Sequence, residues 1–198
     1  MSNNDLKSLV GFLYNLSLLE EETFKLYKNI AEKVDFPLIN AMLTEISLDS
    51  QKHYRLLKGI IESIPTVDLN TKDAQKLLIK AQKAMGEFSA YFANTKKIDE
   101  NNLPELIEKL SLLESQMGEE YEVLVQAKSV VFFSSEVSRN YNFKAEVFKK
   151  IFEKIISDEE HHSEILETIK DVINKKDKEL LRKDPLLKYR RLGVPRPQ

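Results

Sequence analysis

The 198-residue sequence contains no cysteine. Without cysteine, the chain cannot form disulfide bonds, use a catalytic thiolate, or bind iron–sulfur clusters and zinc through sulfur. A metal ion in this protein would have to be bound by glutamate, aspartate and histidine side chains. Such ligands suit iron, manganese or zinc.

Glycine and proline are also scarce, at five and six residues, and β-branched residues rarely alternate with polar ones. Apolar residues instead recur at spacings of three and four, so the sequence predicts an all-α protein. No apolar run approaches the ~20 residues that span a bilayer, and the N-terminus lacks the basic and apolar segments of a signal peptide. We therefore expect a cytoplasmic protein without a membrane segment.

The overall charge balance is nearly neutral. A net charge of −2 and a pI of about 6.0 give no general reason to expect nucleic acid as a partner.

Four long helices are predicted from the apolar spacing. Pro37 and Pro104 occupy first-turn positions of the second and third helices, where a helix does not need the amide hydrogen that proline lacks. The predicted helices span residues 4–34, 37–63, 104 to at least 128, and 143–174. Whether the third helix continues to residue 137 stays open.

The connection between the second and third long helices is unusually long. It would contain one shorter helix over residues 73–92, and it far exceeds the roughly 2–8 residues that usually join neighbouring helices of a bundle. A crossover explains this length, because it lets the third long helix begin at the far end of the bundle. The bundle is expected to occupy residues 1–176, and residues 177–198 are expected to form a short helix and a basic extended tail.

A short repeat relates the first and third helices. The segment Leu16-Ser-Leu-Leu-Glu20 recurs as Leu110-Ser-Leu-Leu-Glu114. In each copy a tyrosine, Tyr27 or Tyr121, follows the glutamate by seven positions. Seven residues make two helical turns, so each tyrosine shares a helix face with its glutamate.

A second repeat relates the second and fourth helices. Asp49 and His53 align with Asp158 and His162, and two aliphatic residues follow at matching positions in both segments. Either repeat alone could arise by chance, but both occur in the same order on separate long helices. The chain is therefore interpreted as two copies of one helical hairpin, with an inward glutamate on the first helix of each copy and a histidine on the second.

Glu159 and His162 lie three residues apart, about one turn along the same side of a helix. A carboxylate and an imidazole beside an apolar stripe suit a metal ion held between helices. The spacing is also common on solvated helix faces, and Glu160 could be mistaken for the inward residue. His161 should point about 100° away from His162 and face solvent.

These motifs resemble the ferritin-like superfamily of di-metal carboxylate four-helix bundles, and within it the rubrerythrin group most closely. The resemblance implies two divalent metal ions, iron first, with manganese or zinc as alternatives. It also implies Tyr27 and Tyr121 as candidate catalytic residues, which would hydrogen-bond the ligand carboxylates or carry an electron. The candidate metal ligands are Glu20, Asp49, His53, Glu114, Glu159 and His162.

The sequence departs from the family pattern at one position. The family has Glu-x-x-His on the second helix as well, whereas Ser50 stands three residues before His53. Three interpretations stay open: Asp49 replaces the missing ligand, one metal position is weak or empty, or the site has lost its activity. The lack of cysteine also means that the rubredoxin-like module of full rubrerythrins is absent, so electrons would have to come from another protein.

The resemblance implies a di-iron or iron–manganese oxidoreductase that oxidises ferrous iron or reduces peroxide, with a role in oxidative stress. The alternatives are a metal-binding protein without catalysis and a partner-binding bundle with a degenerate site. A homodimer is expected by analogy with the family.

Overall fold

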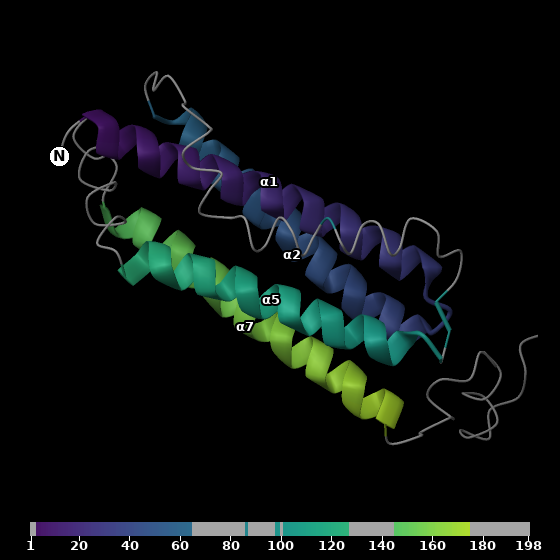
Figure 1. The fold of residues 1–198 in the computed structure, drawn as a ribbon. Helices are drawn as coiled ribbons and strands as arrows, with labels where there is room; N and C mark the ends of the chain where they lie inside the picture. The colour runs from purple at the N-terminus through teal and green to yellow at the C-terminus, as the bar shows by residue number, and fades with distance from the viewer. Residues whose placement is uncertain (1–2, 65–85, 87–97, 100, 127–144, 175–198) are drawn as a thin grey trace, which may run out of the picture.

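The computed structural model describes residues 3–64, 86, 98–99, 101–126 and 145–174 (Figure 1). The prediction of an all-α protein is confirmed for these residues, in which the only β pairing is an isolated parallel bridge between Val34 and Ile98. Four long helices account for most of the described chain. They are α1 (Asn3–Lys33), α2 (Pro37–Glu62), α5 (Leu103–Gln126) and α7 (Ala145–Asn174).

The described helix ends agree closely with those predicted from the sequence. Helix α2 begins at Pro37, after Phe36 in an extended conformation, and Pro104 lies in the first turn of α5. Both prolines therefore occupy the positions where their fixed φ angle favours the start of a helix. At the other end of α2, the amide of Ser63 donates to the carbonyls of Gly59 and Ile60.

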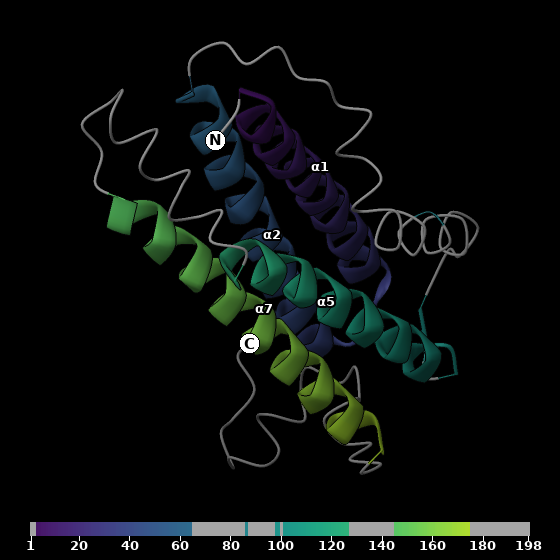
Figure 2. The ribbon, with the colours of Figure 1, turned by 60° about the vertical axis from the view of Figure 1, so that its left-hand side comes forward.

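The helices form two hairpin-like pairs that face each other. Helix α1 packs mainly against α2, and α5 packs mainly against α7 (Figures 1 and 2). The amide of Ile98 donates to the carbonyl of Lys33 at 3.0 Å, which ties the chain just before α5 to the turn between α1 and α2. The last residue of α2 and the first of α5 therefore lie at opposite ends of the bundle.

Several predictions fall on residues outside the described ranges. These are the crossover path, the shorter helix over 73–92, the extension of the third helix beyond 126, and the helix and basic tail after 176. They stay predictions. None of the described helices combines the length and the apolar character needed to cross a membrane.

Two apolar clusters make up the described core. The first cluster lies toward the α1–α2 turn and includes Ile30, Leu43, Leu110 and Ile169. The second lies toward the opposite end and includes Leu13, Leu57, Phe152 and Ile155. Along α2 and α7, buried polar residues occur between the parts of the helix that belong to the two clusters. The helical repeat thus places a polar layer inside an otherwise apolar bundle.

Candidate metal centre

Three glutamates and two histidines form the centre of the polar layer. They come from all four long helices, and none of them is more than 3% exposed. Each is flanked along its helix by apolar residues at three- and four-residue spacing, so the face that buries the stripe also buries the polar side chain. The five residues are Glu20 on α1, His53 on α2, Glu114 on α5, and Glu159 and His162 on α7.

The first ligand group contains Glu20, His53 and Glu159. One donor atom from each side chain lies within 4.8 Å of the others. The Nδ1 atom of His53 is 3.3 Å from Oε1 of Glu20 and 3.2 Å from Oε1 of Glu159. Two carboxylates and one imidazole from three helices therefore point at a common volume.

The second ligand group contains Glu114, Glu159 and His162, whose donor atoms again lie within 4.8 Å of one another. The Nδ1 atom of His162 is 3.0 Å from Oε2 of Glu114 and 3.7 Å from Oε2 of Glu159. Glu159 belongs to both groups, and the centroids of the two histidine rings are 6.0 Å apart. The site therefore offers two adjacent positions that share one carboxylate.

Many donor atoms of this layer lack a hydrogen-bond partner among the described residues. They are Glu20 Oε2, His53 Nδ1, Glu114 Oε1 and both carboxylate oxygens of Glu159. An unsatisfied buried polar atom costs about 1–3 kcal/mol, and a buried carboxylate without a positive partner costs more. Within the described chain, the ion pairs of these three glutamates are with histidines. The residues present therefore fit a cation with oxygen and nitrogen ligands.

Two aspartates contact the histidines at Nε2, whereas the glutamates contact them at Nδ1. Oδ2 of Asp158 is 3.1 Å from Nε2 of His53, and Oδ2 of Asp49 is 3.5 Å from Nε2 of His162. A carboxylate at the remote nitrogen holds a ligating imidazole in one orientation. Asp49 thus contacts a histidine from outside both ligand groups.

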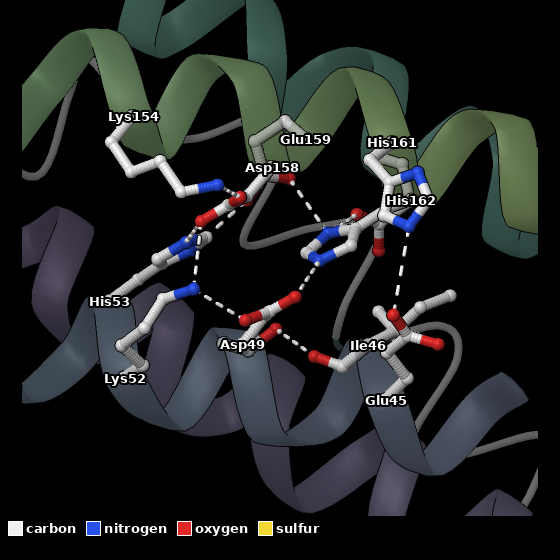
Figure 3. Close-up of polar contacts among 12 residues, drawn as sticks. Glu45, Ile46, Asp49, Lys52, His53, Lys154, Asp158, Glu159, His161 and His162 are labelled. Atoms are coloured by element: carbon white, nitrogen blue, oxygen red, sulfur yellow. Dashed lines mark hydrogen bonds and ion pairs between the residues drawn. The ribbon is translucent and has the colours of Figure 1, made fainter. Parts of the chain in front are cut away.

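Lys52 connects the two aspartates, since its ammonium group forms ion pairs with both Asp49 and Asp158 (Figure 3). Asp158 also pairs with Lys154, one turn before it on α7. Burial alone would raise the pKa of Asp158, but hydrogen bonds from Lys154, Lys52 and His53 outweigh it and lower that pKa. Asp158 is therefore ionised and available to accept a hydrogen bond from His53.

The two tyrosines differ in their contacts. The hydroxyl of Tyr121 donates to Oε1 of Glu20 at 2.5 Å, so a tyrosine from one hairpin supports a glutamate of the other. The hydroxyl of Tyr27 is buried and makes no hydrogen bond of ordinary geometry among the described residues, although the nearby carboxylate of Glu114 acts on it. Burial, and then the charge of Glu114, raise the pKa of Tyr27 well above its usual value. Both tyrosines therefore keep their protons.

The buried charges shift one another's pKa values strongly. Burial would lower the pKa of both histidines, but the nearby carboxylates outweigh it and raise the pKa of His53 to about 10 and that of His162 to about 11. Burial and the charge of Glu159 raise the pKa of Glu114 to about 7. Burial would also raise the pKa of Glu159, but both histidines hold it at about 2. Without a metal ion, the two imidazolium groups thus neutralise two carboxylates, and a metal ion must displace their protons.

Of the six ligands expected from the sequence, the structure brings together all but Asp49. Ser50 is buried beside the site, where its hydroxyl donates to the carbonyl of Ile46 at 3.2 Å. The neighbouring residues Glu160 and His161 are exposed, and His161 forms ion pairs with Glu45 and Glu164. Because successive side chains on a helix point about 100° apart, Glu159 and His162 face the core while Glu160 and His161 face solvent.

Sequence reasoning did not assign a role to Asp158, Lys52 or Lys154. One signal for Asp158 was present, because the second repeat already aligns it with Asp49. Lys154 lies four residues before Asp158 on α7, a spacing at which opposite charges pair on a helix. Lys52 gave no such signal, because only the packing of α2 against α7 brings it to this carboxylate.

No family model, curated protein or solved structure matches this chain. The resemblance to rubrerythrin-type proteins therefore stays a prediction from the motifs.

Proposed function

We propose that this protein binds two divalent metal ions in the polar layer of its bundle. Glu20 and His53 would bind one ion, and Glu114 and His162 would bind the other. Glu159 would contribute an oxygen to each. Iron is the metal we favour, with manganese or zinc as alternatives, because glutamate and histidine donors suit all three.

The proposed activity is oxidation of ferrous iron or reduction of peroxide. A bound pair of iron ions, or of iron and manganese, would supply the redox chemistry. The protein's part is to hold the donors and limit access of water: the two apolar clusters border the polar layer, Tyr121 holds one oxygen of Glu20, and Asp158 orients His53. Electrons for repeated turnover would come from another protein, since this chain has no cysteine for an iron–sulfur module.

The observation that carries this proposal is that three buried glutamates and two buried histidines bring their donor atoms together in two adjacent groups. Neutral hydrogen-bond partners could satisfy some of these atoms, but three carboxylates in an apolar core also need positive charge. Two imidazolium groups provide only part of it. Divalent cations would provide the rest and would leave each imidazole neutral, as metal ligation requires.

Metal analysis after anaerobic loading with ferrous iron tests the proposal. We expect about two ions per chain, as in other bundles that carry paired carboxylate and histidine motifs. Glu160→Gln serves as the matched control for Glu159→Gln, because the two residues are neighbours on α7 and only Glu159 is buried. Less than about one ion per chain in the unmodified protein would contradict the proposal.

A bundle without catalysis is the second candidate. It is favoured by the protonated histidines, which can neutralise two carboxylates without metal, and by Ser50, which leaves one family ligand missing. This candidate predicts that the iron-loaded protein neither consumes peroxide nor oxidises added ferrous iron. Sustained turnover with an added electron donor would rule it out.

Dimerisation is a separate proposal that rests on family analogy alone. Sedimentation velocity of the metal-loaded protein would test it directly.

A further inference from the structure

Ser50 occupies the position in the first hairpin that corresponds to Glu159 in the second. The neighbouring matches fix this correspondence, because Asp49 aligns with Asp158 and His53 with His162. The structure supports the alignment, since each aspartate contacts the histidine of the opposite hairpin. The site thus has one shared carboxylate where its own internal repeat would supply two.

The serine hydroxyl does not replace the missing carboxylate. Ser50 is 1% exposed, and its hydroxyl donates to the carbonyl of Ile46 in the preceding turn of α2. A serine side chain is also shorter than glutamate and carries no charge. Ser50 therefore supplies neither the carboxylate oxygens nor the negative charge that Glu159 provides in the other hairpin.

The charge of the site leads to the same conclusion. Two divalent ions carry four positive charges, whereas the two ligand groups together contain three carboxylates and two histidines that bind in their neutral form. The surrounding charges do not correct this difference, because Asp49 and Asp158 are paired with Lys52 and Lys154. A site loaded with two divalent ions would therefore hold one uncompensated positive charge in a buried layer.

The ligand groups are also incomplete in number. Each group contains three side chains, whereas iron and manganese usually bind more donors than three. Both oxygens of Glu159, one of Glu20 and one of Glu114 have no hydrogen-bond partner within the described chain. These oxygens could add donors to each ion, but none of them replaces the separate carboxylate that the internal repeat would place at position 50.

We propose that a small carboxylate anion, of the size of formate or acetate, occupies the position of the missing glutamate beside Ser50. This inference rests on the proposed two-metal site. The anion would supply the absent negative charge and two oxygen donors, so the protein would bind its second metal ion together with the anion. The proposal is limited to small carboxylates, because Ser50 is buried among the packed helices.

Cobalt(II) titration in the presence of acetate tests this inference without any assay of activity. The visible absorption of protein-bound cobalt reports its coordination, and sodium perchlorate keeps the ionic strength constant without competing strongly for the metal. We expect acetate to raise the affinity for the second cobalt ion at least about tenfold, which corresponds to 1.4 kcal/mol. Formate should act similarly, whereas pivalate should have no effect.

Three substitutions at Ser50 separate the contributions of charge and space. Ser50→Glu supplies the carboxylate internally, so it should bind two cobalt ions without acetate and show no acetate response. Ser50→Gln fills the same space without charge, so it should lose the acetate response and gain no metal. Ser50→Ala should keep the acetate response, because the hydroxyl is not a ligand in this account. Ser115→Glu adds the same side chain at an exposed position next to Glu114 and should behave as the unmodified protein.

The outcomes distinguish this inference from the proposed function. Binding of two cobalt ions with an affinity that acetate does not change would overturn the inference and leave the two-metal site standing. No cobalt binding at any acetate concentration would overturn both. An acetate response that persists in Ser50→Glu would also overturn the inference. If that variant does not fold, the comparison of Ser50→Ala with Ser50→Gln and the selectivity for formate over pivalate still decide the question.

Discussion

The two hairpins contribute unequally to the polar layer. Helices α1 and α2 supply Glu20 and His53, whereas α5 and α7 supply Glu114, His162 and also Glu159, which belongs to both ligand groups. The difference comes from one position, since Ser50 stands where the repeat would place a second shared glutamate. Each hairpin thus supplies a glutamate and a histidine, but the link between the two metal positions comes from the second hairpin alone.

The supporting contacts are unequal as well. Asp158, with a 6% exposed side chain, lies 3.1 Å from His53, whereas Asp49, with a 25% exposed side chain, lies 3.5 Å from His162. Glu20 accepts a hydrogen bond from Tyr121, and the corresponding Tyr27 makes no hydrogen bond of ordinary geometry among the described residues. The position built on Glu20 and His53 is therefore the more firmly supported of the two. This difference can be tested residue by residue.

The largest effect is expected from Glu159→Gln. This change removes an anionic donor from both ligand groups, so we expect the affinity for both metal ions to fall by more than about 100-fold, beyond the 10–100-fold typical of residues that only support a ligand. Isothermal titration with manganese(II) would measure the loss. Retention of one tight ion would mean that the two positions do not depend on a shared carboxylate.

His53→Ala and His162→Ala should each remove one metal ion and leave the other. Each histidine belongs to a single ligand group, so the metal content should fall from about two ions to about one in either variant. Metal analysis after gel filtration would show this, with His161→Ala as the exposed control. Loss of both ions from either single variant would contradict the assignment of one histidine to each position.

Asp158→Asn should weaken metal binding more than Asp49→Asn. Changes to a carboxylate that orients a ligating histidine typically cost about 10–100-fold in metal affinity, and the shorter, more buried contact of Asp158 places it toward the upper part of that range. Manganese titrations of the two variants would compare them directly. An equal loss, or a larger loss for Asp49→Asn, would remove the proposed difference between the two positions.

The stability of the metal-free protein should depend on pH through the buried histidines. Their usual pKa of 6.5 is raised to about 10 and about 11 in the folded state, so their stabilising contribution is complete below pH 6.5 and is lost as pH rises through about 10. The pKa of Glu159 is lowered from 4.5 to about 2, so its contribution is present above pH 4.5 and is lost as pH falls toward 2. The pKa of Glu114 is raised from 4.5 to about 7, so its burial costs stability as pH rises through that range. We therefore expect the highest stability near pH 4.5.

Thermal unfolding of the chelator-treated protein would measure this profile. The unfolding temperature should fall between pH 6.5 and 10, and this fall should be smaller in His162→Gln than in the exposed-site control His161→Gln. A rise in stability over that range would show that the imidazoles are not held protonated by the glutamates.

The smallest effect is expected from the tyrosines. Tyr121→Phe removes a hydrogen bond to a buried carboxylate and should lower the free energy of unfolding by about 1–3 kcal/mol. Tyr27→Phe should cost less, because the Tyr27 hydroxyl acts on the Glu114 carboxylate without a hydrogen bond of ordinary geometry. Urea unfolding of both metal-free variants would measure the two free energies of unfolding. An equal decrease in both variants would contradict this prediction.

The helices and the inward residues of the site could be predicted from the sequence because both follow from helical spacing. The spacing of Leu16, Glu20 and Tyr27 places all three on one face, and the same holds for His162 and Glu159. Contacts between helices could not be predicted in this way, because they depend on how α2 and α7 are packed. The sequence therefore suggested Asp49 as a metal ligand, whereas packing places it against the remote nitrogen of His162.

Lys52 illustrates the same limit. Both Lys52 and Lys154 pair with Asp158, but Lys154 does so from one turn earlier on α7, whereas Lys52 reaches it only across the α2–α7 contact. The repeat did contain the information that Asp49 and Asp158 are equivalent. The repeat could not show that each aspartate contacts the histidine of the other hairpin.

The central claim is that two cations lie side by side in the buried polar layer and share Glu159. An anomalous-difference map at the iron absorption edge, from crystals of the iron-loaded protein, tests it most directly. We expect two peaks, one next to Glu20 and His53 and the other next to Glu114 and His162, with Glu159 contacting both. Absence of peaks in this layer, or iron bound only at exposed residues such as His161, would contradict it.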